Sequence, residues 1–200
     1  MKVIDTPPLL TIAIPTFNRG GLLRELLASL VPQLKLRSEI EFIISDNCSP
    51  DDTQEVIKIF SKDILSINYV RNSVNIGSDE NFIQCFHLAR GKFFWLLGDD
   101  DIVMPGAIEK IISLLRNHSP DLVHLSSSVF HSDYVSETRP DPLSRGYRII
   151  SDSGCFVRLT NVMLTFISSN IINRDRLLEI NCKPVELARG SHLIQLSWTL

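Results

Sequence analysis

The sequence of 200 residues has few cysteines and places them far from one another. None of the four belongs to a CxxC pair or to a Cys/His cluster with the spacing of zinc ligands. This pattern excludes the common structural zinc motifs and disfavours a disulfide framework. It predicts reduced thiols in a cytoplasmic protein.

The sequence also lacks a basic excess and a long apolar run. A formal net charge of −3 disfavours nucleic acid as a partner, because nucleic-acid binding needs a basic face. No run approaches the roughly 20 apolar residues that span a bilayer, and the N-terminus lacks the apolar centre of a signal peptide. We expect a cytoplasmic protein with a small ligand, free or peripheral to the inner face of the cytoplasmic membrane.

Two nucleotide-binding motifs are missing as well. No GxGxxG follows the first apolar run and no GxxxxGK[ST] occurs anywhere, which disfavours a dehydrogenase or a P-loop phosphotransferase. There is no internal repeat and no low-complexity segment. The length suits one α/β domain with a sizeable core.

Short apolar runs alternate with helical patterns along the first two thirds of the chain. This alternation predicts right-handed crossovers and a mostly parallel, Rossmann-like central sheet flanked by helices. The expected strands are 9–15, 39–46, 66–72, 92–98 and 121–130, and the expected helices are 19–34, 49–63, 78–91 and 106–118.

The pattern is less regular after residue 130. Residues 131–149 are polar and contain prolines, which predicts a loop over the edge of the sheet. We expect a helix over 154–166, a short strand with a turn over 167–175, and the start of another helix over 191–200. The sequence stops inside this last pattern, so we expect a natural C-terminal extension to be missing.

Polar residues follow four of the predicted strands, and "GDDD" is the most unusual of these endings. Asp99, Asp100 and Asp101 repel one another, and each costs several kcal/mol if it is buried without a partner. Adjacent carboxylates can hold Mg²⁺ or Mn²⁺ and bridge it to phosphates. Alternatively, they are solvated acids that precede the helix begun near Pro105.

The other strand ends each allow two interpretations. Asp46 could accept a hydrogen bond from a nucleotide base or could form a local turn. Asn18 and Arg19 could grip a nucleotide or cap the following helix. Asn75 and Gly77 could cradle ribose or phosphate, or form an ordinary turn.

Taken together, four segments resemble a known family. "TIAIPTFNR", "FIISDNCSPDDT", "NIGS" and "ARGKFFWLLGDDDIVMPGAI" resemble, in order and spacing, the motifs of family 2 glycosyltransferases with the GT-A fold. The resemblance is strong over 9–118 and weaker beyond. It implies a nucleotide-sugar donor, a divalent metal (Mn²⁺ or Mg²⁺) and transfer, with inversion, to an acceptor hydroxyl.

The resemblance also assigns roles to individual residues. It implies that Pro15, Thr16 and Asn18 line the base and ribose and that Asp46 contacts the base. The DxD region of the family corresponds to 99–101, and Asp100 matches its main metal-binding aspartate.

Two departures from the family pattern affect these roles. Gly98 stands where the usual first aspartate of the family motif lies, so Asp99 is expected to take over the ribose or second metal contact. Glu80 and Asn81 replace a common Arg-Asn pair, which removes a phosphate-binding cation. The form "NIGSDEN…GDDD" resembles bacterial surface-polysaccharide enzymes that include abequosyltransferases, which use a CDP-dideoxyhexose.

The catalytic base is the least certain of the implied residues. The family usually places an acidic "ED" pair at the start of a late helix, and the corresponding stretch here is "ARGSHLIQLSW". His192 is the nearest titratable group, and a neutral imidazole suits a general base. Alternatively, His192 is only a half-exposed residue at the start of a helix. Glu186 is the second candidate for the base.

These observations predict a single GT-A domain over 1–200. Residues 1–130 would form the nucleotide-sugar half and 131–200 the half that binds the acceptor. We expect a metal-dependent, hexosyltransferase-type enzyme of surface-polysaccharide or O-antigen synthesis, with a CDP- or UDP-sugar donor and a glycan or lipid-linked acceptor. The alternative is a nucleotide-sugar binding module without transfer activity, which the absent "ED" pair favours.

Overall fold

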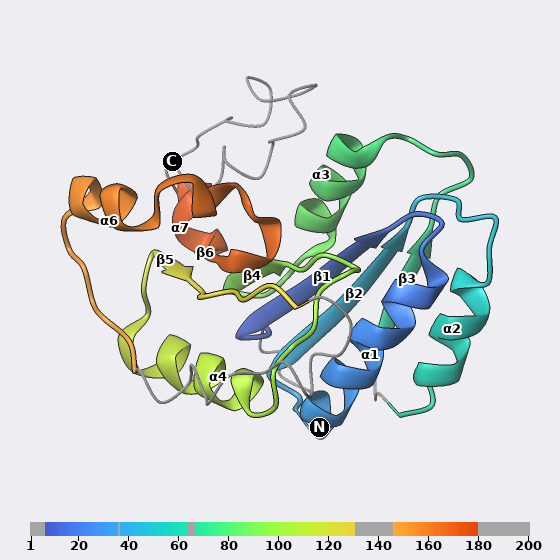
Figure 1. Ribbon diagram of the computed structural model, residues 1–200, viewed down its shortest axis with the longest axis horizontal. Helices are drawn as coiled ribbons and strands as arrows, with labels where there is room; N and C mark the ends of the chain where they lie inside the picture. The colour runs from blue at the N-terminus through green and yellow to red at the C-terminus, as the bar shows by residue number, and fades with distance from the viewer. Residues whose placement is uncertain (1–6, 36, 64–66, 131–145, 180–200) are drawn as a thin grey trace, which may run out of the picture.

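The computed structural model describes residues 7–35, 37–63, 67–130 and 146–179. Within these residues the chain forms one six-stranded sheet in the order β3-β2-β1-β4-β6-β5, with helices on both faces (Figure 1). The strands are β1 (Leu10–Thr16), β2 (Ile40–Asp46), β3 (Ile67–Arg71), β4 (Phe93–Leu96), β5 (Leu122–His124) and β6 (Asn170–Asn173). The helices are α1 (Gly20–Leu34), α2 (Thr53–Phe60), α3 (Ser78–Leu88), α4 (Ala107–His118), α6 (Ser153–Thr160) and α7 (Arg174–Glu179), with 3₁₀ turns η2 (Asn161–Thr165) and η3 (Ile167–Ser169).

The strands β3, β2, β1 and β4 run parallel, which confirms the predicted Rossmann-like α/β architecture. Alternate side chains of each strand enter two separate apolar layers. Ile12 and Ile14 pack with α1, α2 and α4, whereas Ala13 packs on the opposite face with α3. Burial on both faces explains why these strands appear in the sequence as continuous apolar runs.

The other two strands differ from expectation. β6 pairs antiparallel with β4 and separates it from β5, so the fifth strand of the chain lies at the edge of the sheet. The predicted strand 121–130 was too long, because β5 spans only Leu122–His124. Its partner β6 has four residues, and three serines at 126–128 follow in place of apolar side chains.

The predicted helix over 154–166 was also too long. α6 ends at Thr160, because Asn161 adopts a left-handed backbone with φ of 47° that an α-helix cannot contain. The chain continues through η2 and η3 before β6 begins. The strand expected over 167–175 is therefore confined to β6, and α7 begins directly after it.

The register of the parallel strands aligns their carboxyl ends. Thr16 is opposite Asp46, and Asp46 is opposite Arg71 on the next strand. The turn that follows β4 reaches the same edge, because the Leu97 amide still bonds to the carbonyl of Ala13 at 2.9 Å. This edge of the sheet gathers the polar residues that the sequence placed after separate strands.

Within the described part of the chain, none of the helices combines the length and the apolar content needed to cross a bilayer. Residues 131–145 of the predicted loop and the predicted helix 191–200 lie outside the described residues. Residues 146–149 of the predicted loop have no regular secondary structure, as expected.

Candidate functional site

The three aspartates lie in a tight turn over residues 98–101, called the acidic turn below. Gly98 permits this turn, because a side chain there would meet its neighbours. An added Cβ would lie 2.9 Å from Oδ2 of Asp101 and 3.0 Å from Oδ1 of Asp100. The departure from the family pattern at Gly98 therefore has a steric reason in this chain.

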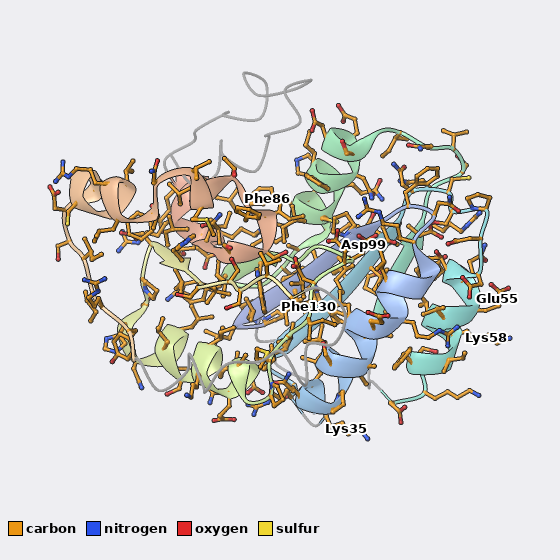
Figure 2. All side chains as sticks on the ribbon, viewed as in Figure 1. Lys35, Glu55, Lys58, Phe86, Asp99 and Phe130 are labelled. Atoms are coloured by element: carbon orange, nitrogen blue, oxygen red, sulfur yellow. The ribbon has the colours of Figure 1, made fainter. Side chains whose placement is uncertain are left out.

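Two of the three carboxylates share one cation. Nη1 of Arg19 donates to Oδ1 of Asp99 at 3.0 Å and to Oδ2 of Asp100 at 3.2 Å. Asp99 is buried and Asp100 is half exposed. Figure 2 places Asp99 toward the middle of the molecule, whereas Glu55 and Lys58 of α2 lie at its periphery. The carboxylates thus converge on a positive group that solvent can reach.

The third carboxylate has a different partner. Asp101 accepts a hydrogen bond from the hydroxyl of Ser168 in η3, and that hydroxyl accepts from the Gly98 amide at 2.8 Å. The structure therefore brings Asp99 and Asp100 together at Arg19 and ties Asp101 to the C-terminal part of the chain.

The pKa values of these groups are shifted by burial and by their neighbours. Burial raises the pKa of Asp99, and the Thr16 hydroxyl and the Arg19 guanidinium oppose that shift. Burial also raises the pKa of Asp101, against the hydrogen bond from Ser168. The charge of Asp99 raises the pKa of Arg19. The net rise for Asp99 means that its partners compensate its burial incompletely, so a further positive charge would be stabilised here.

Thr16 and Pro15 end β1 and are buried beside this turn. The Thr16 hydroxyl lies next to Asp99 but forms no hydrogen bond of regular geometry within the described residues. Asn18 and Arg19 follow on the exposed side, and Asn18 has a left-handed backbone with φ of 55°. The backbone amide of Asn18 donates to Oγ of Ser49 at 2.9 Å. This hydrogen bond joins the loops after β1 and β2.

Neither Asn18 nor Arg19 caps α1 through its side chain. The Gly20 amide at the helix start instead donates to Oδ2 of Asp51 at 2.8 Å, and Oδ1 of Asp51 accepts from Thr53. One carboxylate therefore serves the first residues of both α1 and α2. This contact leaves the Asn18 and Arg19 side chains available to the site.

Asp46 is fully buried at the end of β2, with its carboxylate engaged by three groups. Oδ1 accepts from the Ser49 amide at 2.8 Å, and Oδ2 accepts from the Tyr69 hydroxyl at 2.8 Å. Nε of Arg71 lies 3.3 Å from the same Oδ2. Asp46 therefore does organise a local turn, and a base contact would share the carboxylate with Tyr69 and Arg71. Its role in base recognition stays a prediction.

Asn75 and Gly77 belong to a loop that Asn47 organises. The Asn47 amide group donates to Oδ1 of Asn75 at 2.8 Å and to the Gly77 carbonyl at 3.2 Å. Its Oδ1 accepts from the Ile76 amide at 2.9 Å and from Asn72 at 3.1 Å. Asn75 and Gly77 are exposed at the same edge as Asp46, so their predicted ligand contacts are sterically open.

Asn81, which follows the lost cation position, is buried under β2. Its Oδ1 accepts from the Ser45 hydroxyl at 2.6 Å and its amide donates to the Ser45 carbonyl at 3.0 Å. It supports the end of β2 and does not reach toward a phosphate.

Several residues of this edge were not identified from the sequence. Tyr69, Arg71 and Ser49 surround Asp46. Tyr69 and Arg71 could have been found by placing the predicted third strand parallel to the second, because this pairing puts Arg71 opposite Asp46. Ser168 had no such signal. The two candidate bases, Glu186 and His192, lie outside the described residues.

The donor set fits a divalent cation whose coordination is completed by water or by ligand phosphates. Among the described residues, no three His, Cys, Asp or Glu side chains converge to hold a metal by themselves. Mg²⁺ and Mn²⁺ need only one or two carboxylates when water and ligand phosphates complete their coordination. Asp99 and Asp100 meet that requirement, and the guanidinium of Arg19 marks the position between them as one that accepts a cation.

The sequence profile of Glycosyl transferase family 2 matches residues 11–179. The chain belongs to this family. It is 45% identical over 94 residues to the abequosyltransferase RfbV of Salmonella typhimurium, a match that covers 46% of this chain and 28% of that protein. It is 34% identical over 106 residues to the Campylobacter jejuni GalNAc(5)-diNAcBac-PP-undecaprenol beta-1,3-glucosyltransferase, covering 52% and 34% of the two chains.

Solved structures share the fold at lower sequence identity. Staphylococcus aureus TarS (residues 1–349) superposes with a TM-score of 0.70 at 18% identity, over 94% of this chain and 54% of that chain. The Pyrobaculum calidifontis mannosyltransferase PcManGT, in complex with GDP-Man and Mn²⁺, has a TM-score of 0.59 at 16% identity, over 91% and 49%. The chain thus spans about half or less of the length of these relatives.

Proposed function

We propose that this chain is the donor-binding part of a metal-dependent, inverting glycosyltransferase. The observation that supports it best is the convergence of Asp99 and Asp100 on one nitrogen of Arg19, at 3.0 and 3.2 Å. Two carboxylates that share a solvent-accessible cation form the donor set expected where a metal joins the protein to a diphosphate.

Asp99 and Asp100 would hold Mn²⁺ or Mg²⁺, and the metal would neutralise the charge that develops on the leaving diphosphate. Asp101 remains a predicted ligand, although its described partner is Ser168. Arg19 compensates the carboxylates when no metal is bound. Once displaced, its guanidinium lies within reach of the diphosphate, which is a role suited to an arginine.

The aligned carboxyl ends provide a place for the rest of the nucleotide. We propose that Pro15, Thr16 and Asn18 line the base and ribose and that Asp46 orients the base. Asn75 and Gly77 lie on the loop that borders the same edge. A row of polar groups from several parallel strands, ending at the acidic turn, can bind an elongated ligand with a base at one end and phosphates at the other.

Transfer needs a base on the acceptor side, because a sugar hydroxyl is a poor nucleophile. General-base assistance is typically worth about 10² to 10⁴ in rate. Asp99 and Asp100 are assigned to the metal in this proposal, Asp101 is bonded to Ser168 and Asp46 is fully buried. We therefore retain His192, and after it Glu186, as the proposed base. Attack from the face opposite the diphosphate would invert the anomeric centre.

The names of the relatives indicate the substrate class. One is an abequosyltransferase, another transfers glucose to an undecaprenol-linked saccharide, and TarS has been crystallised with UDP-GlcNAc. We therefore propose a CDP- or UDP-sugar donor and a glycan or lipid-linked acceptor of surface-polysaccharide synthesis, such as O-antigen. Such an acceptor would place the protein in the cytoplasm, at the inner face of the membrane.

Release of nucleoside diphosphate from a panel of CDP- and UDP-sugars, with glycan acceptors and Mn²⁺, tests this proposal. We expect release that depends on both metal and acceptor and that Asp100→Ala abolishes. Asp121→Asn is a matched control, because Asp121 is an exposed carboxylate at the start of β5, at the other edge of the sheet. Donor binding without release under any of these conditions would favour a nucleotide-sugar binding module.

A further inference from the structure

Ser168 connects the C-terminal part of the chain with the acidic turn. It lies in η3, just before β6, and its partner Gly98 is 70 positions earlier in the sequence. Its hydroxyl accepts a hydrogen bond from the Gly98 amide at 2.8 Å and donates one to the carboxylate of Asp101. Both ends of the acidic turn are therefore bound by one side chain.

The backbone of Ser168 adds a third contact. Its carbonyl accepts from Nε1 of Trp95 at 2.8 Å, and Trp95 is a buried residue of β4. This bond fixes η3 against the strand that leads into the acidic turn. The position of the Ser168 hydroxyl is therefore set by the core of the sheet and not by the turn alone.

This arrangement separates one carboxylate of the acidic turn from the other two. Three adjacent carboxylates repel one another, and this repulsion is strongest if all three point toward the same cation. Ser168 binds Asp101 on the side of the C-terminal segment, while Asp99 and Asp100 converge on Arg19. The tight packing at Gly98, where an added Cβ would also lie 3.2 Å from the Ser168 hydroxyl, leaves the turn little freedom to rearrange.

We propose that Ser168 is a positioning residue for the metal site. It holds Asp101 and the Gly98 amide so that the carboxylates of Asp99 and Asp100 stay directed at one cation. This inference rests on the proposed function, because it assumes that the cation bound with the nucleotide is a divalent metal. It also makes η3, which lies in the C-terminal part of the chain, part of the donor site.

The test compares Ser168→Ala with the wild-type chain. Mn²⁺ bound in the presence of UDP or CDP is measured by counting free Mn²⁺ with electron paramagnetic resonance, so no transfer activity is needed. We expect the variant to bind Mn²⁺ about tenfold more weakly, because residues that orient metal ligands typically contribute about 10- to 100-fold to affinity. The thermal unfolding midpoint is measured for each variant in the absence of metal.

Two further variants separate positioning from a general effect on folding. Ser168→Thr keeps the hydroxyl at a half-buried position and is expected to restore Mn²⁺ affinity to within about twofold of the wild type. Ser169→Ala removes the adjacent buried serine hydroxyl, while the hydrogen bonds that Ser169 makes to Leu125 and Phe166 come from its backbone. We expect this control to bind Mn²⁺ like the wild type.

The outcomes distinguish the two proposals. If the wild-type chain binds no Mn²⁺ with either nucleotide, the proposed function is wrong and the role of Ser168 is rejected with it. If the wild type binds Mn²⁺ and Ser168→Ala binds equally well, only the role of Ser168 is overturned. Equal losses in Ser168→Ala and Ser169→Ala, or no recovery in Ser168→Thr, would overturn it as well.

Discussion

Glu41 and Asp99 lie at opposite ends of the parallel strands and are almost equally buried, at 8% and 5% exposed, but their partners differ. Glu41 accepts from the Thr11 hydroxyl at 2.6 Å and from the amide and Nε of Arg90 at 2.8 and 2.7 Å. Asp99 accepts from the half-exposed Arg19 at 3.0 Å and lies next to the Thr16 hydroxyl.

The difference separates a structural carboxylate from one that is prepared for a ligand. The Thr11 hydroxyl and the backbone amide of Arg90 are placed at Glu41 by the fold itself, and the exposed Arg90 side chain adds an ion pair, so the burial of Glu41 is compensated within the protein. The compensation of Asp99 is less complete, because burial raises its pKa in spite of the Thr16 hydroxyl and the Arg19 guanidinium, and no backbone amide is among these partners. A buried carboxylate whose charge is incompletely compensated is expected at a binding site.

The largest expected effect concerns the structural side of this comparison. Glu41→Ala should lower the free energy of unfolding by about 3 kcal/mol, because it leaves the buried Thr11 hydroxyl and the partly buried backbone amide of Arg90 without an acceptor. Urea denaturation measures this change. A loss below about 1 kcal/mol would remove the contrast with Asp99.

The same kind of change at Asp99 should act on binding instead. Asp99→Asn is expected to weaken Mn²⁺-dependent UDP or CDP binding about 100-fold, or about 2.8 kcal/mol, while leaving urea stability unchanged or slightly higher. The variant removes a charge that is costly to bury, so the fold does not suffer. Asp121→Asn serves as the control, and a strong loss of stability in Asp99→Asn would assign Asp99 a structural role.

Replacement of Arg19 should have a smaller effect, and metal binding and nucleotide binding should respond differently. Arg19→Gln should bind Mn²⁺ alone about tenfold more tightly, because the competing cation between Asp99 and Asp100 is gone. Binding of UDP together with Mn²⁺ should not gain in the same way, since the guanidinium is no longer available to the diphosphate. Calorimetric titrations measure both affinities.

Arg24→Gln is the matched control for this variant. Arg24 is also a half-exposed arginine near the start of α1, but it pairs with Asp52 at 3.5 Å. If Arg19→Gln and Arg24→Gln bind Mn²⁺ equally, Arg19 does not occupy the cation position.

The smallest expected effect is the pH dependence of stability without metal. A carboxyl group whose pKa is raised by folding stabilises the folded state fully below its ordinary pKa of 3.8, and this contribution is lost as pH rises through the raised pKa. Asp99→Asn avoids that loss. Its excess stability over the wild type at about pH 7 should therefore shrink as the pH is lowered to about 4. Urea denaturation in a chelator checks this, and an excess that grows on acidification would contradict the pKa direction.

Much of this edge of the sheet could be predicted from the sequence. The apolar runs are buried on both faces, and each ends in polar residues, so a parallel sheet necessarily brings Thr16, Asp46 and the acidic turn to one edge. The family motifs cover the same residues. Local pattern and topology agree there, which is why the prediction succeeds.

The remaining features depend on contacts that local pattern cannot show. Nothing in "FISSN" indicates that Ser168 would reach Gly98, because the contact exists only after β6 has paired with β4. The separation of Asp101 from its two neighbours has the same cause. The left-handed Asn161 that ends α6 was compatible with the helical pattern around it, so the early end of that helix was missed.

The most direct test of the central claim is a calorimetric titration of the wild-type chain with UDP and CDP, with and without Mn²⁺, beside Asp100→Ala. We expect at least one nucleotide to bind the wild type with Mn²⁺ and to bind at least about tenfold more weakly without it or in the variant. Equal affinity with and without Mn²⁺, or wild-type affinity in Asp100→Ala, would contradict the assignment of the acidic turn as a metal–diphosphate site.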